Sequence, residues 1–91
     1  MLFRSSSVFS PTVEQMRIVP NPASSTLWVE HATGVTRLDI VNTFGQRVST
    51  ISISNELRTD IDVARFPAGM YQISAIDAAG RLVGISKFIK Q

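Results

Sequence analysis

Short apolar stretches separated by turn residues set the strongest limit on how this chain can fold. From Met16 onward the turn signals recur every 8–12 residues, and each stretch between them has the length and β-branched content of a strand. Seven strands are predicted, at residues 16–19, 26–31, 36–42, 46–53, 58–63, 70–77 and 81–90. Many short strands at this spacing are typical of a sandwich or barrel. The sequence therefore predicts an all-β protein.

Alternating apolar residues indicate which side of each strand faces the core. The pairs that share a face are Leu27 with Val29, Leu38 with Ile40, Ile61 with Val63, and Tyr71 with Ile73 and Ala75. In 46–53 the alternation slips, because Val48 and Ile51 lie three positions apart. A bulge near Ser49–Thr50 would turn both toward the core. A helix over 56–66 is the main alternative to the strand predicted there.

Two turns of the same form are expected to close hairpins. They begin with Asn42 and Asp77, and each has a glycine three positions later, Gly45 and Gly80. Asn and Asp side chains accept hydrogen bonds from the backbone that follows them, and glycine takes a positive φ without strain. The pattern predicts type I turns followed by a bulge.

A third turn, at 66–69, joins the fifth and sixth predicted strands. Pro67 fixes its own φ, and Gly69 allows a left-handed exit into the next strand. Tyr71 follows two residues later, and its hydroxyl is expected to bond to upstream backbone as in a tyrosine corner. Gly84 interrupts the last strand and indicates a bulge or a close backbone approach.

Composition excludes several classes of protein. With 91 residues there is room for one domain, and 44% hydrophobic with 18% charged residues suits a folded module. Cysteine is absent, which excludes disulfides and thiolate metal sites. No apolar run approaches the roughly 20 residues of a membrane-spanning helix. Nine basic and seven acidic residues are spread along the chain, so we expect no nucleic-acid partner.

The first 14 residues differ from the rest. They are polar, serine-rich and interrupted by Pro11, so 1–14 are interpreted as a linker or as residues that are not native, and 15–91 as the domain. This start lacks the charged and apolar regions of a signal peptide. Export would therefore require that the domain be part of a longer protein.

We find no residues with the pattern of a catalytic, cofactor or metal site, and we expect none. No G-x-S-x-G elbow or glycine-rich phosphate loop occurs. His31 is the only histidine, with Glu30 as its one acidic neighbour. Asp60 and Asp62 share a strand face, which is interpreted as solvated rather than as a calcium site. Trp28 alternates with apolar residues and is expected to face outward or to cover a sandwich edge.

Four segments, in this order, resemble the C-terminal sorting domain of the type IX secretion system, also called the Por secretion system sorting domain, type A. They are 18–29 (IVPNPASSTLWV), 38–48 (LDIVNTFGQRV), 61–71 (IDVARFPAGMY) and 86–90 (SKFIK). The chain departs from the family pattern at Val19, where an aromatic residue is commoner, and at Gln91, which extends one residue past the basic-apolar end.

This resemblance implies a seven-stranded antiparallel immunoglobulin-like β-sandwich attached to an upstream cargo protein. It implies export of the cargo to the periplasm, recognition of the domain by an outer-membrane translocon, and usually removal by a sortase that joins the cargo to an anionic lipopolysaccharide. The cargo would then lie on the cell surface or outside the cell. The alternative is a fibronectin-like or carbohydrate-binding accessory module of a secreted enzyme.

Two segments are candidates for recognition. The first is Pro20, Asn21 and Pro22, which form a rigid turn because both prolines restrict the backbone. The second is the end of the last strand, with residues Lys87, Phe88, Ile89 and Lys90. Its charges either protect an edge strand from aggregation or are read by the translocon through β-augmentation. We expect 86–90 to contribute least to the core. Edge strands can also pair two copies into a dimer.

Overall fold

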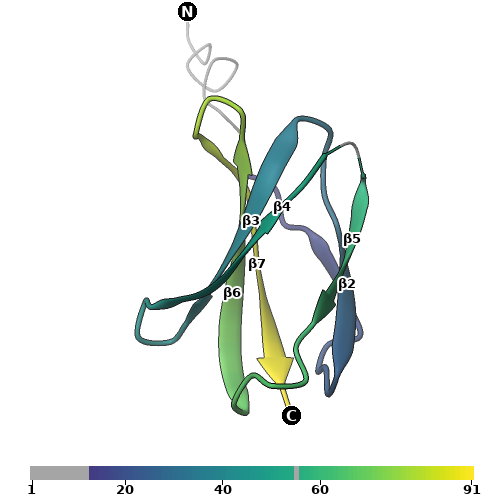
Figure 1. Cartoon of the computed structure of the whole chain (residues 1–91), viewed down its shortest axis with the longest axis vertical. Helices are drawn as coiled ribbons and strands as arrows, with labels where there is room; N and C mark the ends of the chain where they lie inside the picture. The colour runs from purple at the N-terminus through teal and green to yellow at the C-terminus, as the bar shows by residue number, and fades with distance from the viewer. Residues whose placement is uncertain (1–12, 55) are drawn as a thin grey trace, which may run out of the picture.

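A computed structural model of the chain describes residues 13–54 and 56–91, and all seven strands found there lie close to the predicted ones (Figure 1). The strands are β1 (Arg17–Val19), β2 (Thr26–Glu30), β3 (Val35–Asn42), β4 (Arg47–Ser52), β5 (Arg58–Asp62), β6 (Gly69–Asp77) and β7 (Leu82–Lys90). A strand, not a helix, therefore forms within 56–66. The described part of the chain contains no helix that could span a membrane.

The strands form two antiparallel sheets that face each other. One sheet has three strands in the order β1-β2-β5, and the other has four in the order β4-β3-β6-β7. Figure 1 shows β2 and β5 on one side and β3, β6 and β7 on the other. This is the arrangement of an immunoglobulin-like sandwich, so the predicted fold class is confirmed.

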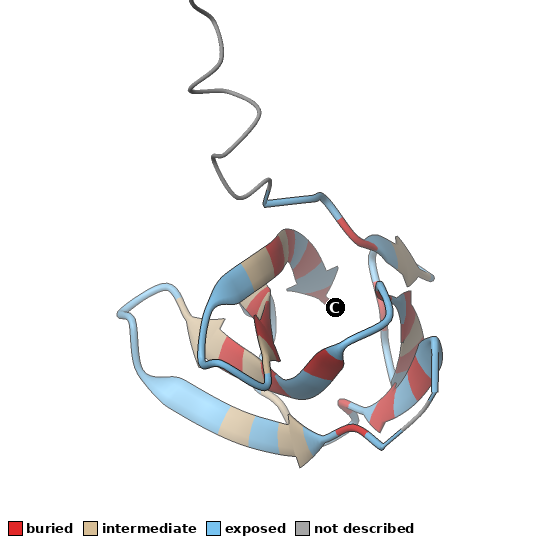
Figure 2. Cartoon of the chain, turned by 90° about the horizontal axis from the view of Figure 1, so that it is seen from above, coloured by how far each residue is buried: buried red, intermediate tan, exposed pale blue. Residues whose placement is uncertain are grey.

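The core lies between the sheets and is built from residues two apart along each strand. Seen from above, the buried positions recur along the strands that surround the interior, while the turns of the β3–β4 and β6–β7 hairpins are exposed (Figure 2). The largest fully buried side chains are Phe88, Leu27, Leu38, Ile40, Ile73, Val29 and Val63. Several of these were identified from alternation alone, because one face of each strand must be apolar.

The two hairpin turns have the same hydrogen bonds. The Oδ1 atom of Asn42 accepts backbone N–H bonds from residues two and four positions on, at 2.9 and 3.0 Å. The Oδ1 atom of Asp77 does the same at 3.0 and 2.9 Å. Gly45 and Gly80 take φ values of 80° and 83°. These left-handed values are easily reached only by glycine.

The bulge in β4 differs from the predicted one. Ile40 pairs with Ser49, and the next residue of β3 pairs with Arg47, so Val48 is the extra residue. Val48 is 41% exposed, and the prediction that a bulge near Ser49–Thr50 turns it to the core is wrong. The inward positions of β4 are taken by Ser49 and Ile51, which leaves the bulged side chain outside.

Candidate recognition site

The last strand is divided between the core and the surface. Ser86, Phe88 and Lys90 point inward and are 6%, 1% and 7% exposed, whereas Lys87 and Ile89 point outward. The expectation that 86–90 contributes least to the core is therefore wrong. The reason is the strand period of two, which carries the inward phase of β7 to its end. Only Lys87 and Ile89 of the four candidate residues offer side chains to a partner.

Aromatic rings anchor this strand in the core. The ring of Phe88 stacks on the ring of Tyr71 at 5.3 Å between centroids. The ring of Phe66 also contacts Tyr71, at 5.2 Å between centroids. The Tyr71 hydroxyl donates a hydrogen bond of 2.6 Å to the carbonyl oxygen of Pro67, as in a tyrosine corner. The Lys90 ammonium donates a bond of 3.1 Å to the carbonyl oxygen of Phe66. Phe88 and Lys90 thus hold the strand end in place.

The two candidate recognition segments lie side by side. The side-chain amide of Asn21 donates to the carbonyl oxygen of Lys87 at 3.2 Å, and its Oδ1 accepts from the N–H of Ile89 at 2.9 Å. Ala23 continues the contact, since its N–H donates to the carbonyl oxygen of Ile89 at 2.8 Å. The peptide bonds before Pro20 and Pro22 are both cis. The side chain of Asn21 therefore makes the backbone hydrogen bonds along β7 that a neighbouring strand would otherwise make.

A second segment covers the other end of the same strand edge. The N–H of Glu14 donates to the carbonyl oxygen of Val83 at 3.2 Å, and Ile85 donates back to Glu14 at 2.9 Å. Glu14 therefore belongs to the folded part, although it was interpreted as linker, while residues 1–12 of that linker lie outside the described residues. An incoming strand would have to displace both segments to pair along all of β7.

Ser86 ties the N-terminal segment to β7, and this contact was not predicted from the sequence. Its hydroxyl donates to the carbonyl oxygen of Met16 at 2.7 Å, and its Oγ accepts from the N–H of Met16 at 2.6 Å. Gly84 lies next to it, where an added Cβ would be 3.2 Å from the Met16 side chain. A polar residue and a glycine on the inward side of an apolar strand were the available signals for this contact.

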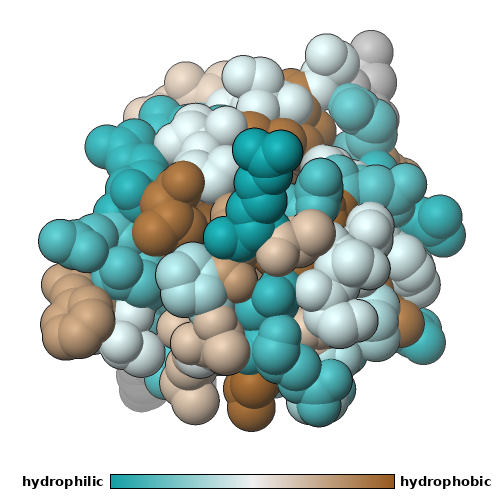
Figure 3. Space-filling view, turned by 60° about the horizontal axis from the view of Figure 1, so that its bottom comes forward, coloured by the Kyte–Doolittle hydropathy of each residue, from teal (hydrophilic) through white to brown (hydrophobic). Residues whose placement is uncertain are grey.

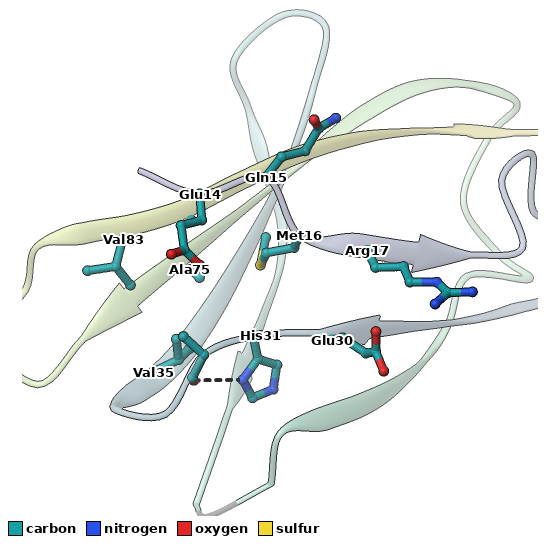
Figure 4. Close-up of a pocket in the computed structure, with 11 residues that line it drawn as sticks. Glu14, Gln15, Met16, Arg17, Glu30, His31, Val35, Ala75 and Val83 are labelled. Atoms are coloured by element: carbon teal, nitrogen blue, oxygen red, sulfur yellow. Dashed lines mark hydrogen bonds between the residues drawn. The ribbon is translucent and has the colours of Figure 1, made fainter. Parts of the chain in front are cut away.

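His31 lines a hollow of about 340 Å³, with Glu14 on the opposite side of the hollow and Glu30 as its neighbour in the chain (Figure 4). It is 7% exposed, and its Nε2 lies 3.0 Å from the hydroxyl of Thr59. Its Nδ1 lies 3.4 Å from the carbonyl oxygen of Ala32. Both ring nitrogens thus have protein partners. Among the residues that the structure describes, no group of three or more His, Cys, Asp or Glu side chains could hold a metal ion.

Trp28 faces outward from β2 and is flanked by two arginines. The guanidinium carbons of Arg17 and Arg58 lie 5.8 and 4.7 Å from the ring centroid. Both distances are within the range of cation–π contacts. Asp60 and Asp62 are exposed on β5, and Asp60 lies 4.0 Å from Arg58.

Solved structures with the same fold include proteins of other kinds. The structure of CBM51-2 in complex with GlcNAc and the INT domains of Clostridium perfringens ZmpB matches with a TM-score of 0.63 and 10% identity, over 86% of this chain. The chain spans 18% of that structure. CopC from Methylosinus trichosporium OB3b matches with a TM-score of 0.51 and 14% identity, over 88% of this chain and 84% of that chain. At this identity the likeness shows the fold alone.

A search of curated proteins found no significant match. The comparison with protein families is more specific. Residues 17–91 match the family described as the secretion system C-terminal sorting domain, from the start of β1 to the end of the chain. Members of this family are in general not enzymes, and membership indicates export toward the cell surface or the extracellular space. The chain therefore belongs to the C-terminal sorting domains of type IX secretion.

Proposed function

We propose that this domain directs an upstream cargo protein through the type IX outer-membrane translocon and is then removed by a sortase. The cargo would pass through the periplasm and reach the cell surface or the medium. The domain itself would perform no chemistry. The observation that carries the proposal is the family match over residues 17–91, which includes all seven strands.

The outward side chains of β7 are the part of the strand that we propose the secretion machinery reads. Lys87 and Ile89 are exposed, whereas Phe88 is buried. Pro20, Asn21 and Pro22 would act indirectly, because Asn21 bonds to the backbone on either side of Phe88. Reading by side chains requires no displacement of this segment, and reading by β-augmentation does.

Fusion to a reporter tests the sorting role. Residues 13–91 are placed after a reporter that carries its own signal peptide, in a host with a functional type IX system. The fusion begins at residue 13 because Glu14 and Met16 bond to β7. We expect the reporter on the cell surface. A reporter that remains in the periplasm would contradict the proposal.

Substitution of the outward residues tests the reading of β7. Deleting 87–91 would also remove buried Phe88 and Lys90, so a loss of sorting could then reflect unfolding. The double variant Lys87→Ser with Ile89→Ser leaves the core intact, and we expect it to reduce surface display. Leu82→Ser is the matched control, because Leu82 is exposed on the other end of the same strand. Equal display of the two variants would exclude this surface.

Mass spectrometry of the surface-bound reporter tests removal by a sortase. We expect no peptides from residues 30–85 in the mature product. Retention of these peptides would favour the accessory-module alternative, since a binding module stays with its enzyme.

A dimer through edge strands is also a proposal. The outer edge of β4 has no neighbouring strand in the part of the chain that the structure describes. Arg47 and the bulge at Val48 oppose pairing there, because charges and bulges protect edges. Sedimentation equilibrium of the domain measures whether pairing occurs, and Thr50→Pro in β4 would abolish a dimer formed through this edge.

A further inference from the structure

Two cations lie at the ends of one row across the outer face of the four-stranded sheet. In this row Arg47 pairs with Val41, Val41 with Gln72, and Gln72 with Lys87. Directly paired residues of neighbouring strands point to the same face. With about 4.8 Å between neighbouring strands, the Cα atoms of Arg47 and Lys87 are about 14 Å apart.

These two cations have no carboxylate partner among residues 13–54 and 56–91. The ion pairs of the described residues involve Arg37, Arg58 and Arg81. On the outer face of this sheet, Asp39 neutralises Arg37 at 3.3 Å. The face is therefore left with the two positive charges of Arg47 and Lys87.

Apolar side chains lie beside this row. Met70 and Ile89 are direct partners on β6 and β7, and each is 45% exposed. Figure 3 shows this end of the molecule, where hydrophobic side chains lie directly beside strongly hydrophilic ones. An apolar patch with a charged border is the usual composition of a protein interface.

Two hollows lie on this side of the domain. One of about 350 Å³ lies between the β3–β4 hairpin and β6, and its lining includes Val41 and Met70. The other, of about 380 Å³, is lined in part by Ile85. Gln72 and Lys87 contribute to both hollows, so the two are neighbours. The surface can therefore admit side chains of a partner on both sides of Lys87.

We propose that this surface, the docking face, binds an acidic protein surface that carries an apolar side chain. Its residues are Val41, Arg47, Met70, Lys87 and Ile89. Carboxylates of the partner would pair with the two cations, and the apolar side chain would enter the hollow beside Met70. Two cations are too few to track a nucleic-acid backbone, which favours a protein. The inference rests on the proposed function, because the partner would be a component of the secretion machinery.

Charge reversal within the reporter fusion tests the face. The variants are Arg47→Glu, Lys87→Glu and the double variant, with Arg65→Glu as a control that reverses an exposed charge in the connection between β5 and β6. We expect about a tenfold loss of surface display for the double variant, which corresponds to about 1.4 kcal/mol of binding. The control should match wild type. Urea unfolding of each purified domain should show that all variants remain folded.

Photo-cross-linking identifies the chemistry of the partner. A photoreactive residue at Gln72, which lines both hollows, is incorporated into the displayed fusion, and the cross-linked peptide is sequenced. We expect a peptide rich in Asp and Glu, and we expect that changing its acidic residues to Lys restores display of the double variant. A basic peptide, or no restoration by the opposite charges, would overturn the acidic partner.

The two proposals fail in different ways. If the wild-type fusion is not displayed, the sorting role fails. If the wild-type fusion is displayed and the double variant is displayed equally, the sorting role stands and the docking face is wrong.

Discussion

The Oδ1 atom of Asp77 accepts both backbone hydrogen bonds that form its turn. The backbone N–H of Arg81 bonds to this carboxylate and holds its pKa below the ordinary value of 3.8. The charge of Arg81 and the N–H of Ala79 lower the pKa further, against an opposing effect of desolvation. In the other hairpin Asn42 occupies the equivalent position, and its uncharged amide oxygen accepts the equivalent two bonds.

This pair of turns predicts a pH effect for Asp77→Asn. A carboxyl group with a lowered folded-state pKa stabilises the fold above 3.8, and the contribution is lost as pH falls through the folded-state pKa. The variant keeps the amide oxygen but cannot titrate. We therefore expect its free energy of unfolding to fall less steeply than that of wild type below about pH 4. Urea unfolding at a series of pH values measures this, and parallel curves would contradict it.

At the scale of the element, one side of β7 packs in the core and the other side is exposed to solvent. We expect Phe88→Ala to lower the free energy of unfolding by about 3–5 kcal/mol, because a fully buried aromatic side chain leaves a cavity. Ile89→Ala should cost under about 1 kcal/mol, since that side chain is half exposed. Urea unfolding compares the two neighbours directly. Similar losses would mean that the inward and outward sides are assigned wrongly.

The contact of Asn21 with β7 gives a second prediction for this strand. Asn21→Ala removes both bonds, whereas Asn21→Asp keeps the acceptor for Ile89 and loses the donor to Lys87. At about 0.5–1.5 kcal/mol for each bond, we expect amide hydrogen exchange at Ile89 to be fastest in the alanine variant and intermediate in the aspartate variant. The amide of Ile73 on β6 is the internal reference. Unchanged exchange at Ile89 would show that Asn21 does not protect the edge.

At the scale of the whole molecule, Ser86 joins residues that are 70 positions apart. Ser86→Ala leaves the backbone groups of Met16 without their side-chain partner, and unpaired buried groups cost about 1–3 kcal/mol. We expect a loss of stability of this size in thermal or urea unfolding. Ser52→Ala, at an exposed position of β4, is the control and should have little effect. A neutral Ser86→Ala would mean that water replaces the hydroxyl.

Much of the fold could be read from local patterns. Strand lengths, the alternation of Leu38 with Ile40, and the turns at Gly45 and Gly80 depend on interactions within a few residues. The phase of β4 could not be read in this way. The bulge lies at Val48 rather than near Ser49–Thr50, because the pairing of β4 with β3 leaves Val48 without a partner residue.

The candidate site was only partly predictable for the same reason. The sequence identified Asn21 and the end of β7 as two separate segments, each from its own composition. Their contact spans 66 to 68 positions, and no local period encodes such a pairing. The outer row from Arg47 to Lys87 requires the register of four strands, so it was not foreseen.

The sequence by itself determined the number of strands, the form of the turns and the order of the family motifs, because these follow from residue types close together in the chain. Only the tertiary structure decided which face each residue of β7 presents. The pairing of β7 with β6 sets that phase, because Phe88 lies opposite the buried Tyr71 and Lys87 lies opposite Gln72. This phase places Phe88 in the core and leaves Lys87 on the surface, where a partner can reach it.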